Sequence, residues 1–332
     1  MKTIPFIICI DVEPDEREIE QGLASDWIGF EEMARCFNEF RPRLREATGA
    51  PVNFSWFFRM DPQIGKVYGS SSWVFTRYRE IIKQLELAGD ELGLHTHAWR
   101  WEDGLSRWIT DHGNQEWIDY CVHTSFQAYE KVFGRSCRSF RFGDRFMNNE
   151  TMGLIESLGV RFDLTIEPGR WASNDAAPDE LGTGSLPNYM TAPRRPYVPS
   201  SGDFRTADRN RLGLLEIPLT TGKEPGRFAG LKRAASALNI DLQRRHEATP
   251  MYLNFAMPTF RRIMNRLLDE KHAYLSPLVR SEVAARSILK DNLKQNMELM
   301  LSHPSVSRFK FAGPAEAIEF LAGRNSAKNG ET

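Results

Sequence analysis

Residues 137–166 read CRSFRFGDRFMNNETMGLIESLGVRFDLTI, and this stretch predicts the fold. An apolar run, CRSFRF, is followed by a helical pattern over residues 150–158 and by a second apolar run, VRFDLTI, at residues 160–166. Two strands joined by a helix form a right-handed crossover, so both strands are expected to lie parallel in one sheet. Each run is too apolar for a sheet with one solvated face, which indicates that helices cover the sheet.

The same alternation of strand and helix extends along most of the 332 residues. Five further strand-like runs are IPFIICI (4–10), PVNFSWFF (51–58), ELGLHTH (91–97), LLEIPLT (214–220) and AYLSPLV (273–279). Helical patterns lie at residues 30–47, 74–88, 115–133, 259–269 and 281–301. Seven parallel strands in a chain of this length predict an α/β fold whose sheet closes, or nearly closes, into a barrel.

The domain organisation follows from where this alternation stops. We expect one barrel domain over residues 1–323, with a long irregular insertion at residues 171–211 that is rich in Pro, Gly, Asn and Asp. A basic, partly helical segment covers residues 223–249 and has no readable role. Residues 324–332 have the composition of a disordered tail.

Composition excludes several classes of partner. Lys plus Arg number 43 against 44 Asp plus Glu, and no basic block is present, so nucleic acid is not an expected partner. No run of about 18 apolar residues predicts a membrane span, and the N-terminal residues do not resemble a signal peptide. The four cysteines show no metal-binding spacing. Buried free thiols are typical of a reducing compartment, so we expect a cytoplasmic protein.

Two polar pairs stand at strand ends. Asp11 and Glu13 end the first run, and His95 and His97 end the run at residues 91–97. Residues i and i+2 of a strand point to one face, and the carboxyl ends of parallel barrel strands open together. A carboxylate and two imidazoles commonly bind zinc, and a second carboxylate beside them can serve as general base. Each pair alone also fits a solvated strand end or a loop, but the two together favour a metal site.

Three more residues are candidates for the same site. Arg141 shares a strand face with Gly143 and is expected to orient a carboxylate or bind a substrate oxygen, the alternative being a surface pair with Asp144. Asp163 ends its strand and is a candidate partner for Arg141 or a substrate. Trp99 offers a flat ring of the kind that stacks on sugars, although such rings more often pack in a core.

Four segments, in this order, resemble the polysaccharide deacetylase superfamily, which includes carbohydrate esterase family four. They are ICIDVEPD (8–15), GDELGLHTHAW (89–99), SFRFGDRFMNNETMGLIESLGVRFDLT (139–165) and LLEIPL (214–219). The resemblance implies a distorted (β/α)7 barrel of the glycoside hydrolase/deacetylase type. It also implies metal-assisted hydrolysis of a carbon–nitrogen bond that is not a peptide bond, namely N-deacetylation of a sugar or polysaccharide precursor.

The resemblance also implies roles for single residues. Asp11, His95 and His97 match the metal ligands, with zinc expected first and cobalt, nickel or manganese as alternatives. Asp11 or Glu13 matches the general base, and the resemblance leaves their roles open.

The chain departs from the family pattern at two places. The family's histidine motif has two residues between Ser or Thr and the second histidine, so Trp99 stands where that ligand is expected and His97 must replace it. The late strand ends in Arg280 instead of the general-acid histidine, and His272 lies at the strand's other end. Since arginine does not donate a proton near neutral pH, another residue protonates the leaving amine, or Arg280 stabilises an oxyanion, or the step is lost.

These departures keep two other functions open. A barrel that has lost its general acid could bind a saccharide without turning it over. A metal-independent hydrolase of another carbon–nitrogen bond is the second alternative, because one fold hosts many chemistries.

Overall fold

Seven parallel strands form the central sheet of the protein. The computed structural model describes residues 3–17, 19, 24–173, 181–222 and 247–329. The strand order is β10, β8, β7, β4, β3, β2, β13, with every neighbouring pair parallel. The bounds are Cys9–Val12 (β2), Ser55–Arg59 (β3), Glu91–Thr96 (β4), Ser139–Phe142 (β7), Phe162–Asp163 (β8), Leu215–Glu216 (β10) and Leu278–Arg280 (β13). Each overlaps a run predicted as a strand, so the expected α/β fold is confirmed.

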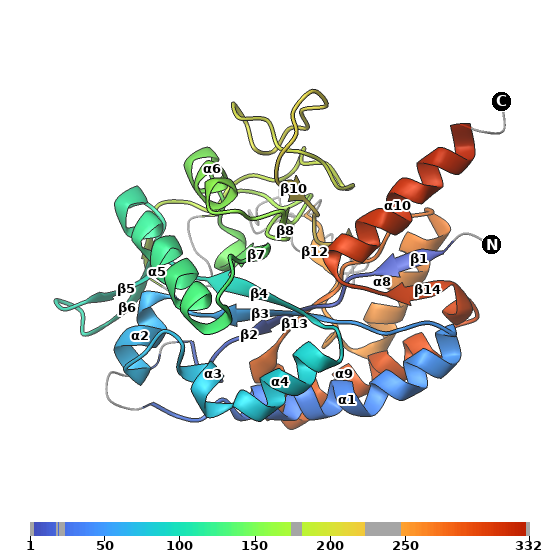
Figure 1. The fold of residues 1–332 in the computed structure, drawn as a ribbon, viewed down its shortest axis with the longest axis horizontal. Coiled ribbons are helices and arrows are strands. Elements are labelled where there is room, and N and C mark those ends of the chain that lie inside the picture. The colour runs from blue at the N-terminus through green and yellow to red at the C-terminus, as the bar shows by residue number, and fades with distance from the viewer. Residues whose placement is uncertain (1–2, 18, 20–23, 174–180, 223–246, 330–332) are drawn as a thin grey trace, which may run out of the picture.

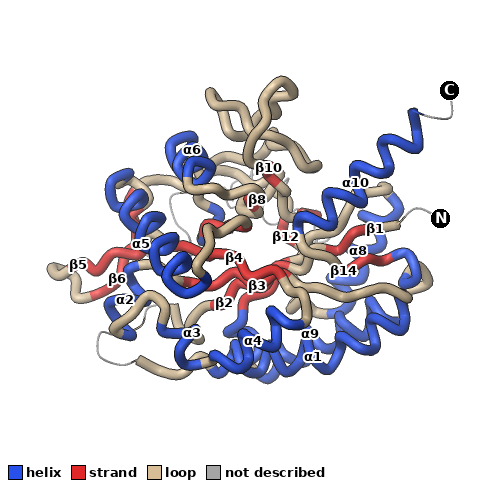
Figure 2. The backbone as a smooth tube through the Cα atoms, viewed as in Figure 1, coloured by secondary structure: helices blue, strands red, loops and turns tan. Residues whose placement is uncertain are grey.

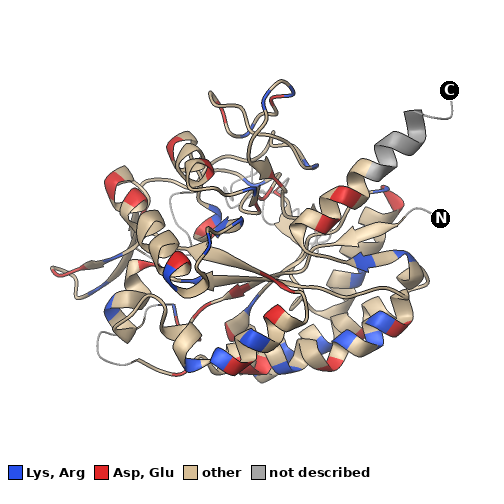
Figure 3. Ribbon diagram, viewed as in Figure 1, with Lys and Arg blue, Asp and Glu red and all other residues tan. Residues whose placement is uncertain are grey.

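Helices surround this sheet, as Figures 1 and 2 show. The longer ones are α1 (Ile28–Thr48), α4 (Arg79–Leu87), α5 (Gln115–Phe133), α6 (Asn149–Ser157), α8 (Met257–Asp269), α9 (Ser287–Leu301) and α10 (Pro314–Asn329). Short helices are α2 (Pro62–Tyr68), α3 (Trp73–Arg77), η1 (Gly143–Arg145), η4 (Ser281–Ala285) and η5 (Val306–Arg308). Apolar faces turn inward: Phe37 of α1 meets Trp56 of β3 with ring centroids 5.7 Å apart. Basic and acidic residues are both present along α1 (Figure 3).

The curled sheet is closed by an irregular segment instead of a direct pairing of its edge strands. Beyond β10, Thr220 donates its amide to the Ser276 carbonyl at 3.1 Å, just before β13. Met251 donates to Thr220 at 2.8 Å, and Leu278 of β13 donates to Met251 at 3.1 Å. Leu253 donates in turn to Leu278 at 2.9 Å. Residues 251–253 therefore fill the seam, and the expected distorted seven-stranded barrel is confirmed.

Among the described residues, seven further strands lie outside the central sheet. β1 (Ile4–Phe6) pairs with β14 (Phe309–Phe311), β5 (Trp99–Glu102) and β6 (Arg107–Asp111) form a hairpin that β9 (Gly182–Thr183) extends, and β11 (Thr221–Gly222) pairs with β12 (Thr249–Pro250). The run at residues 4–10, predicted as one strand, is thus divided between β1 and β2, because a distant segment, β14, supplies the partner of its first half.

The remaining predictions concern the irregular insertion, the C-terminal tail, the basic segment, the cysteines and membrane-spanning helices. The segment 171–211 is largely irregular where it is described, and its strand β9 lies against β6. Helix α10 continues to Asn329, into the stretch predicted to be a disordered tail. Most of the basic segment, residues 223–246, lies outside the described residues. All four cysteines are buried and unpaired. Within the described ranges, no helix has the length and apolar character needed to cross a bilayer.

Candidate active site

The carboxyl ends of the central strands enclose a pocket of ≈ 440 Å³. The parallel register places Asp11 of β2 beside Arg280 of β13, and His95 of β4 beside Arg141 of β7. The predicted acid pair and histidine pair do meet here. The pocket is lined by Asp11, Glu13, Arg17, His95, His97, Arg141, Asp144, Arg145, Glu167, Arg170, Tyr252, Asn254, Phe255, Leu278 and Arg280.

His95 and His97 face each other through their Nε2 atoms, which are 3.0 Å apart. Nδ1 of His95 lies 3.0 Å from the Arg141 carbonyl, which can only accept, so this nitrogen carries the proton and Nε2 keeps its lone pair. Nδ1 of His97 lies 2.9 Å from an Asp144 carboxylate oxygen and is fixed in the same way. Two lone pairs therefore point at one another, an arrangement that a cation between them stabilises.

The two histidines differ in their affinity for a proton. Burial lowers the pKa of His95 to about 4, so this ring is neutral at pH 7. Burial also acts to lower the pKa of His97, but the charge of Asp144 outweighs it and the pKa is raised. A metal ion bound between the rings would compete with a proton for Nε2 of His97, because a metal-bound imidazole nitrogen must be deprotonated.

Glu13, rather than Asp11, completes the cluster of donor atoms. One donor atom each from Glu13, His95 and His97 lies within 4.8 Å of the other two, and all three residues are buried. Oε2 of Glu13 is 3.5 Å from Nε2 of His97 and accepts no hydrogen bond from the described residues. Burial would raise the pKa of Glu13, but His97 and Arg280 lower it below its usual range. A buried, ionised and unsatisfied oxygen beside two imidazole nitrogens fits a divalent cation such as zinc.

Ser281, 268 positions later in the sequence, fixes the backbone of Glu13. Its amide donates to the Ser281 hydroxyl at 3.0 Å, and that hydroxyl donates to the Glu13 carbonyl at 2.9 Å. Ser281 opens η4, directly after β13. Glu13, directly after β2, is therefore held in place by Ser281, directly after β13.

Asp11 is held by Arg141, as expected for an arginine that orients a carboxylate. Nε of Arg141 lies 2.9 Å and 3.0 Å from the two carboxylate oxygens of Asp11. Nη1 of the same arginine donates to the Leu164 carbonyl at 2.8 Å. Oδ2 of Asp11 is 3.8 Å from Nε2 of His95. Asp11 thus lies beside the donor cluster with its orientation fixed.

Asp144 is a site residue that the sequence analysis considered only as a surface partner of Arg141. It contacts His97 instead and forms an ion pair with Arg17. Its φ of 53° is left-handed, as is that of the next residue, Arg145, at 53°. Non-glycine residues held in this region are strained, and such strain is common at functional sites. Gly143, directly before Asp144, leaves room for the ring of His97, since a Cβ there would lie 2.2 Å from Cε1.

Two buried residues behind the cluster were also missed. Arg59 at the end of β3 bonds to Asp61 at 2.9 Å and lies 3.9 Å from Glu13. Asp61 accepts the backbone N–H of His97 at 3.1 Å. The signal was the sequence FFRMD (57–61), another apolar run that ends in charge, which the sequence analysis did not consider.

Arg280 lies at the pocket, where the sequence predicted it. Its Nε is 3.8 Å from Glu13, and its Nη2 is 2.8 Å from Glu282. The side chain is 37% exposed, which leaves it accessible from the pocket. His272 is held through Nδ1 by the Tyr274 carbonyl at 2.8 Å and does not line the pocket.

Trp99 and Asp163, predicted to contact substrate, are not among the residues that line the pocket. Trp99 is 0% exposed and packs behind His97, with its Nε1 3.2 Å from Nδ1 of that ring. Its place in the β5–β6 hairpin turns the ring into a small core instead of the pocket. Asp163 is also 0% exposed. It accepts the Thr165 hydroxyl at 2.7 Å and hydrogen-bonds to Glu216, not to Arg141.

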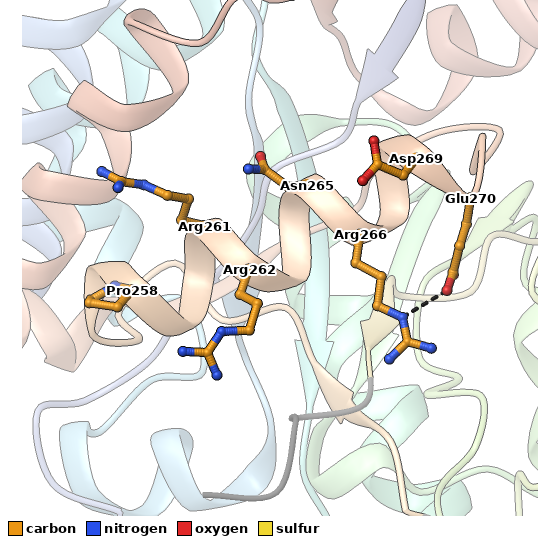
Figure 4. Close-up of a pocket in the computed structure, with 7 residues that line it drawn as sticks. All are labelled: Pro258, Arg261, Arg262, Asn265, Arg266, Asp269 and Glu270. Carbon is orange, nitrogen blue, oxygen red and sulfur yellow. Dashed lines mark hydrogen bonds and ion pairs between the residues drawn. The ribbon is translucent and has the colours of Figure 1, made fainter.

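A second hollow lies along the outer face of α8, and charged side chains in it are exposed to solvent (Figure 4). It is lined by Pro258, Arg261, Arg262, Asn265, Arg266, Asp269 and Glu270. The ion pair drawn there, between Arg266 and Glu270, joins side chains that are 54% and 50% exposed. Solvated groups of this kind have no means of activating a nucleophile, so the strand-end pocket is the candidate active site.

Comparison with known proteins agrees with the barrel. No family model and no curated protein matches the sequence. The structure is similar to that of a protein from Parabacteroides distasonis described as a glycoside hydrolase/deacetylase, with a TM-score of 0.57, 10% identity, and coverage of 97% of this chain and 72% of the other. The fold is that of a glycoside hydrolase/deacetylase barrel. An identity this low shows the fold alone.

Two other solved structures are more distant. A 4-alpha-glucanotransferase from Thermococcus litoralis has a TM-score of 0.49 and 12% identity, with 96% of this chain and 40% of the other covered. A protein from Mycobacterium smegmatis described as a polysaccharide deacetylase has a TM-score of 0.47 and 14% identity, with 98% and 92% covered.

Proposed function

We propose that this protein is a metal-dependent hydrolase that removes an N-acyl group, in the simplest case acetyl, from a sugar or polysaccharide precursor. The observation that carries the proposal is the pair of facing imidazoles with a buried carboxylate beside them. Zinc suits two nitrogens and one oxygen, and cobalt, nickel and manganese are the alternatives. The glycoside hydrolase/deacetylase fold agrees with a saccharide as the partner.

Each residue of the pocket then has a defined task. Glu13, His95 and His97 would hold the ion, which when bound would polarise the amide carbonyl and lower the pKa of the attacking water. Asp11, oriented by Arg141, takes a proton from that water as its oxygen bonds to the acyl carbon. As the carbon–nitrogen bond breaks, Asp11 returns the proton to the departing nitrogen. The products are a carboxylic acid and a free amine.

Arg280 contributes charge and not a proton. Its guanidinium stays protonated at working pH, so it can stabilise negative charge that develops on the carbonyl oxygen. Its accessible position beside Glu13 allows this contact. With Asp11 acting as base and then as acid, the reaction needs no histidine on the last strand.

Metal content and acetate release test the proposal together. The purified protein is expected to bind one zinc, cobalt, nickel or manganese ion per chain and to release acetate from N-acetylated oligosaccharides. His95→Ala and His97→Ala should lose both properties. His123→Ala, on the exposed side of α5, is the matched control and should keep both. Metal content that is the same in all four proteins would contradict the proposed ligands.

The same measurements separate the alternatives. Saccharide binding without acetate release, unchanged by a chelator, would indicate a binding protein. Turnover of another amide that survives metal removal would indicate a metal-independent hydrolase. A single barrel domain over residues 1–323 and a cytoplasmic location stay predictions.

A further inference from the structure

Arg145 lines the pocket but differs from the other arginines there. Arg141 lies 2.9 Å from Asp11, Arg170 lies 2.9 Å from Glu247, and Arg280 lies 2.8 Å from Glu282. Arg17 pairs with Asp144. Within the described ranges of the chain, Arg145 takes part in no ion pair of 4.0 Å or less. The one hydrogen bond of its guanidinium goes from Nη1 to the Trp171 carbonyl at 3.0 Å.

This unpaired cation is also buried. Arg145 is only 8% exposed, and burial together with the charge of Arg170 lowers its pKa below the usual value. A guanidinium offers five N–H donors, and a buried one is stable only when an anion or several acceptors meet it. One carbonyl meets one donor, so the remaining donors face the pocket that Arg145 lines.

The backbone holds Arg145 in this place. Asp144 and Arg145 are both left-handed, and the Tyr189 hydroxyl donates to the Arg145 carbonyl at 2.7 Å. The same short turn therefore presents Asp144 to His97 and Arg145 to the pocket. A group bound by Arg145 would lie in the same pocket as the proposed reaction centre.

The charge of the pocket points in the same direction. Of the five arginines that line it, the other four pair with carboxylates, and a divalent cation at Glu13, His95 and His97 would add positive charge. Positive charge in a cavity with low-dielectric walls attracts anions. A neutral sugar would leave Arg145 without an ion-pair partner among the described residues.

We propose that Arg145 binds an anionic group, through carboxylate or phosphate oxygens, on the substrate, so that the preferred substrate is an acidic N-acylated sugar. The proposal rests on the proposed function for the location of the reaction, but not for the anion site itself. Arginine is suited to this task because its planar fork matches two oxygens of either group.

Binding measurements test the anion site independently of catalysis. Isothermal titration calorimetry would compare neutral N-acetylglucosamine with N-acetylglucosamine 6-phosphate and with N-acetylmuramic acid, which carries a carboxylate. One of the anionic sugars should bind the wild-type protein more tightly than the neutral sugar, and added salt should reduce the advantage. The two anionic sugars distinguish phosphate from carboxylate. Equal affinity for all three sugars would overturn the proposal without any variant.

A substitution then locates the effect. Arg145→Gln should lower the ratio of anionic to neutral affinity by about 10- to 100-fold, the scale of a lost charge-assisted hydrogen bond to a buried group. Arg145→Lys keeps the charge and should retain part of the ratio. Arg261→Gln, in the exposed hollow on α8, is the matched control and should keep the whole ratio. A ratio unchanged in a folded Arg145→Gln variant would overturn the role of this residue.

Turnover separates this idea from the proposed function. If the anionic preference depends on Arg145 but no sugar is deacetylated, the anion site stands and the proposed reaction fails. If sugars are deacetylated with equal kcat/KM whatever their charge, the reaction stands and the anion site fails.

Discussion

Two pairs of buried carboxyl groups stand at strand ends of the same sheet, but only one of the pairs lines the pocket. Asp11 and Glu13, at the end of β2, face arginine and histidine side chains and line the pocket. Asp163 of β8 and Glu216 of β10 hydrogen-bond to each other and do not line it. Burial raises the pKa of both members of the second pair, whereas His97 and Arg280 outweigh burial at Glu13.

The difference shows which surroundings allow an acid at a strand end to act in a metal site. Neither Oδ2 of Asp163 nor Oε2 of Glu216 is met by a donor from the described residues, and from the raised pKa of both carboxyls we infer that the pair shares a proton. A pair that shares one proton holds two strands together and carries one negative charge instead of two, so it attracts a metal ion less strongly. At the β2 pair, Arg141 lies 2.9 Å from Asp11, and His97 and Arg280 lower the pKa of Glu13. Acids at a strand end therefore predict a metal site only where neighbouring strands supply arginine or histidine side chains.

The largest effect is expected when Glu13 is exchanged for its amide, with the same exchange at Glu216 as the control. Glu13→Gln removes an anionic ligand and should lower kcat for acetate release on the order of 10³-fold, because metal polarisation is worth several kcal/mol. Glu216→Gln should leave kcat nearly unchanged, since its amide N–H₂ can donate to Asp163 as the protonated acid does. Equal losses in the two variants, with both folded by circular dichroism, would remove the distinction between the pairs.

A smaller loss is expected when the space beside His97 is filled. Gly143→Ala would place a Cβ 2.2 Å from Cε1 of His97, so the ring must move away from His95. A displacement of about 1 Å can lower a rate by about 10²-fold. Gly153→Ala, inside α6 with nothing within 4 Å of its Cβ, is the control and should stabilise the fold by about 0.5–1 kcal/mol. Full activity in Gly143→Ala would show that the position of His97 does not matter.

Removing the orienting charge should have a more moderate effect. Asp144→Asn keeps the shape of the contact with His97 but loses its charge, and substitutions of this kind reduce metal affinity by about 10- to 100-fold. Competition with a chromophoric zinc chelator measures the affinity. Asp203→Asn, at a half-exposed pair with Arg205, is the control. An unchanged zinc Kd would mean that Asp144 does not orient His97.

The smallest effect concerns stability and pH. A carboxyl group whose folded-state pKa is raised stabilises the fold fully below its unfolded pKa, near 4.5 for Glu216, and this contribution is lost as pH rises toward the folded value. Glu216→Gln does not titrate. Its melting temperature minus that of the wild type should therefore grow as pH rises above about 4.5. Thermal unfolding between pH 4 and pH 8 measures the difference, and a constant or shrinking value would contradict a shared proton.

The barrel was largely predictable because apolar runs mark buried strands. All seven predicted runs contribute to the central sheet, and the helix at residues 115–133 matches α5 at both ends. The division of residues 4–10 between β1 and β2 was not predictable locally, since β14 lies at the far end of the chain. The β5–β6 hairpin was missed because Trp99 was considered as a possible sugar contact instead of a strand residue.

The site was predictable in its residue types but not in its contacts. The i, i+2 spacing brought His95 and His97 to one face, as expected. Spacing alone could not choose between Asp11 and Glu13, because that choice depends on Arg141 reaching Asp11 from another strand. The role of Asp144 depends on a left-handed turn, for which the sequence carries no clear signal.

The link between Glu13 and Ser281 sets an order for making the protein in the cell. The two residues are separated by 268 positions in the sequence. At translation rates of about 5–20 residues per second, roughly 10–50 s pass between the synthesis of the acid and that of the residue that fixes it. A nascent chain therefore carries all three proposed ligands before Ser281 is present to fix the backbone of Glu13. A metal ion at the proposed site would then find its final geometry only after β13 has joined the barrel.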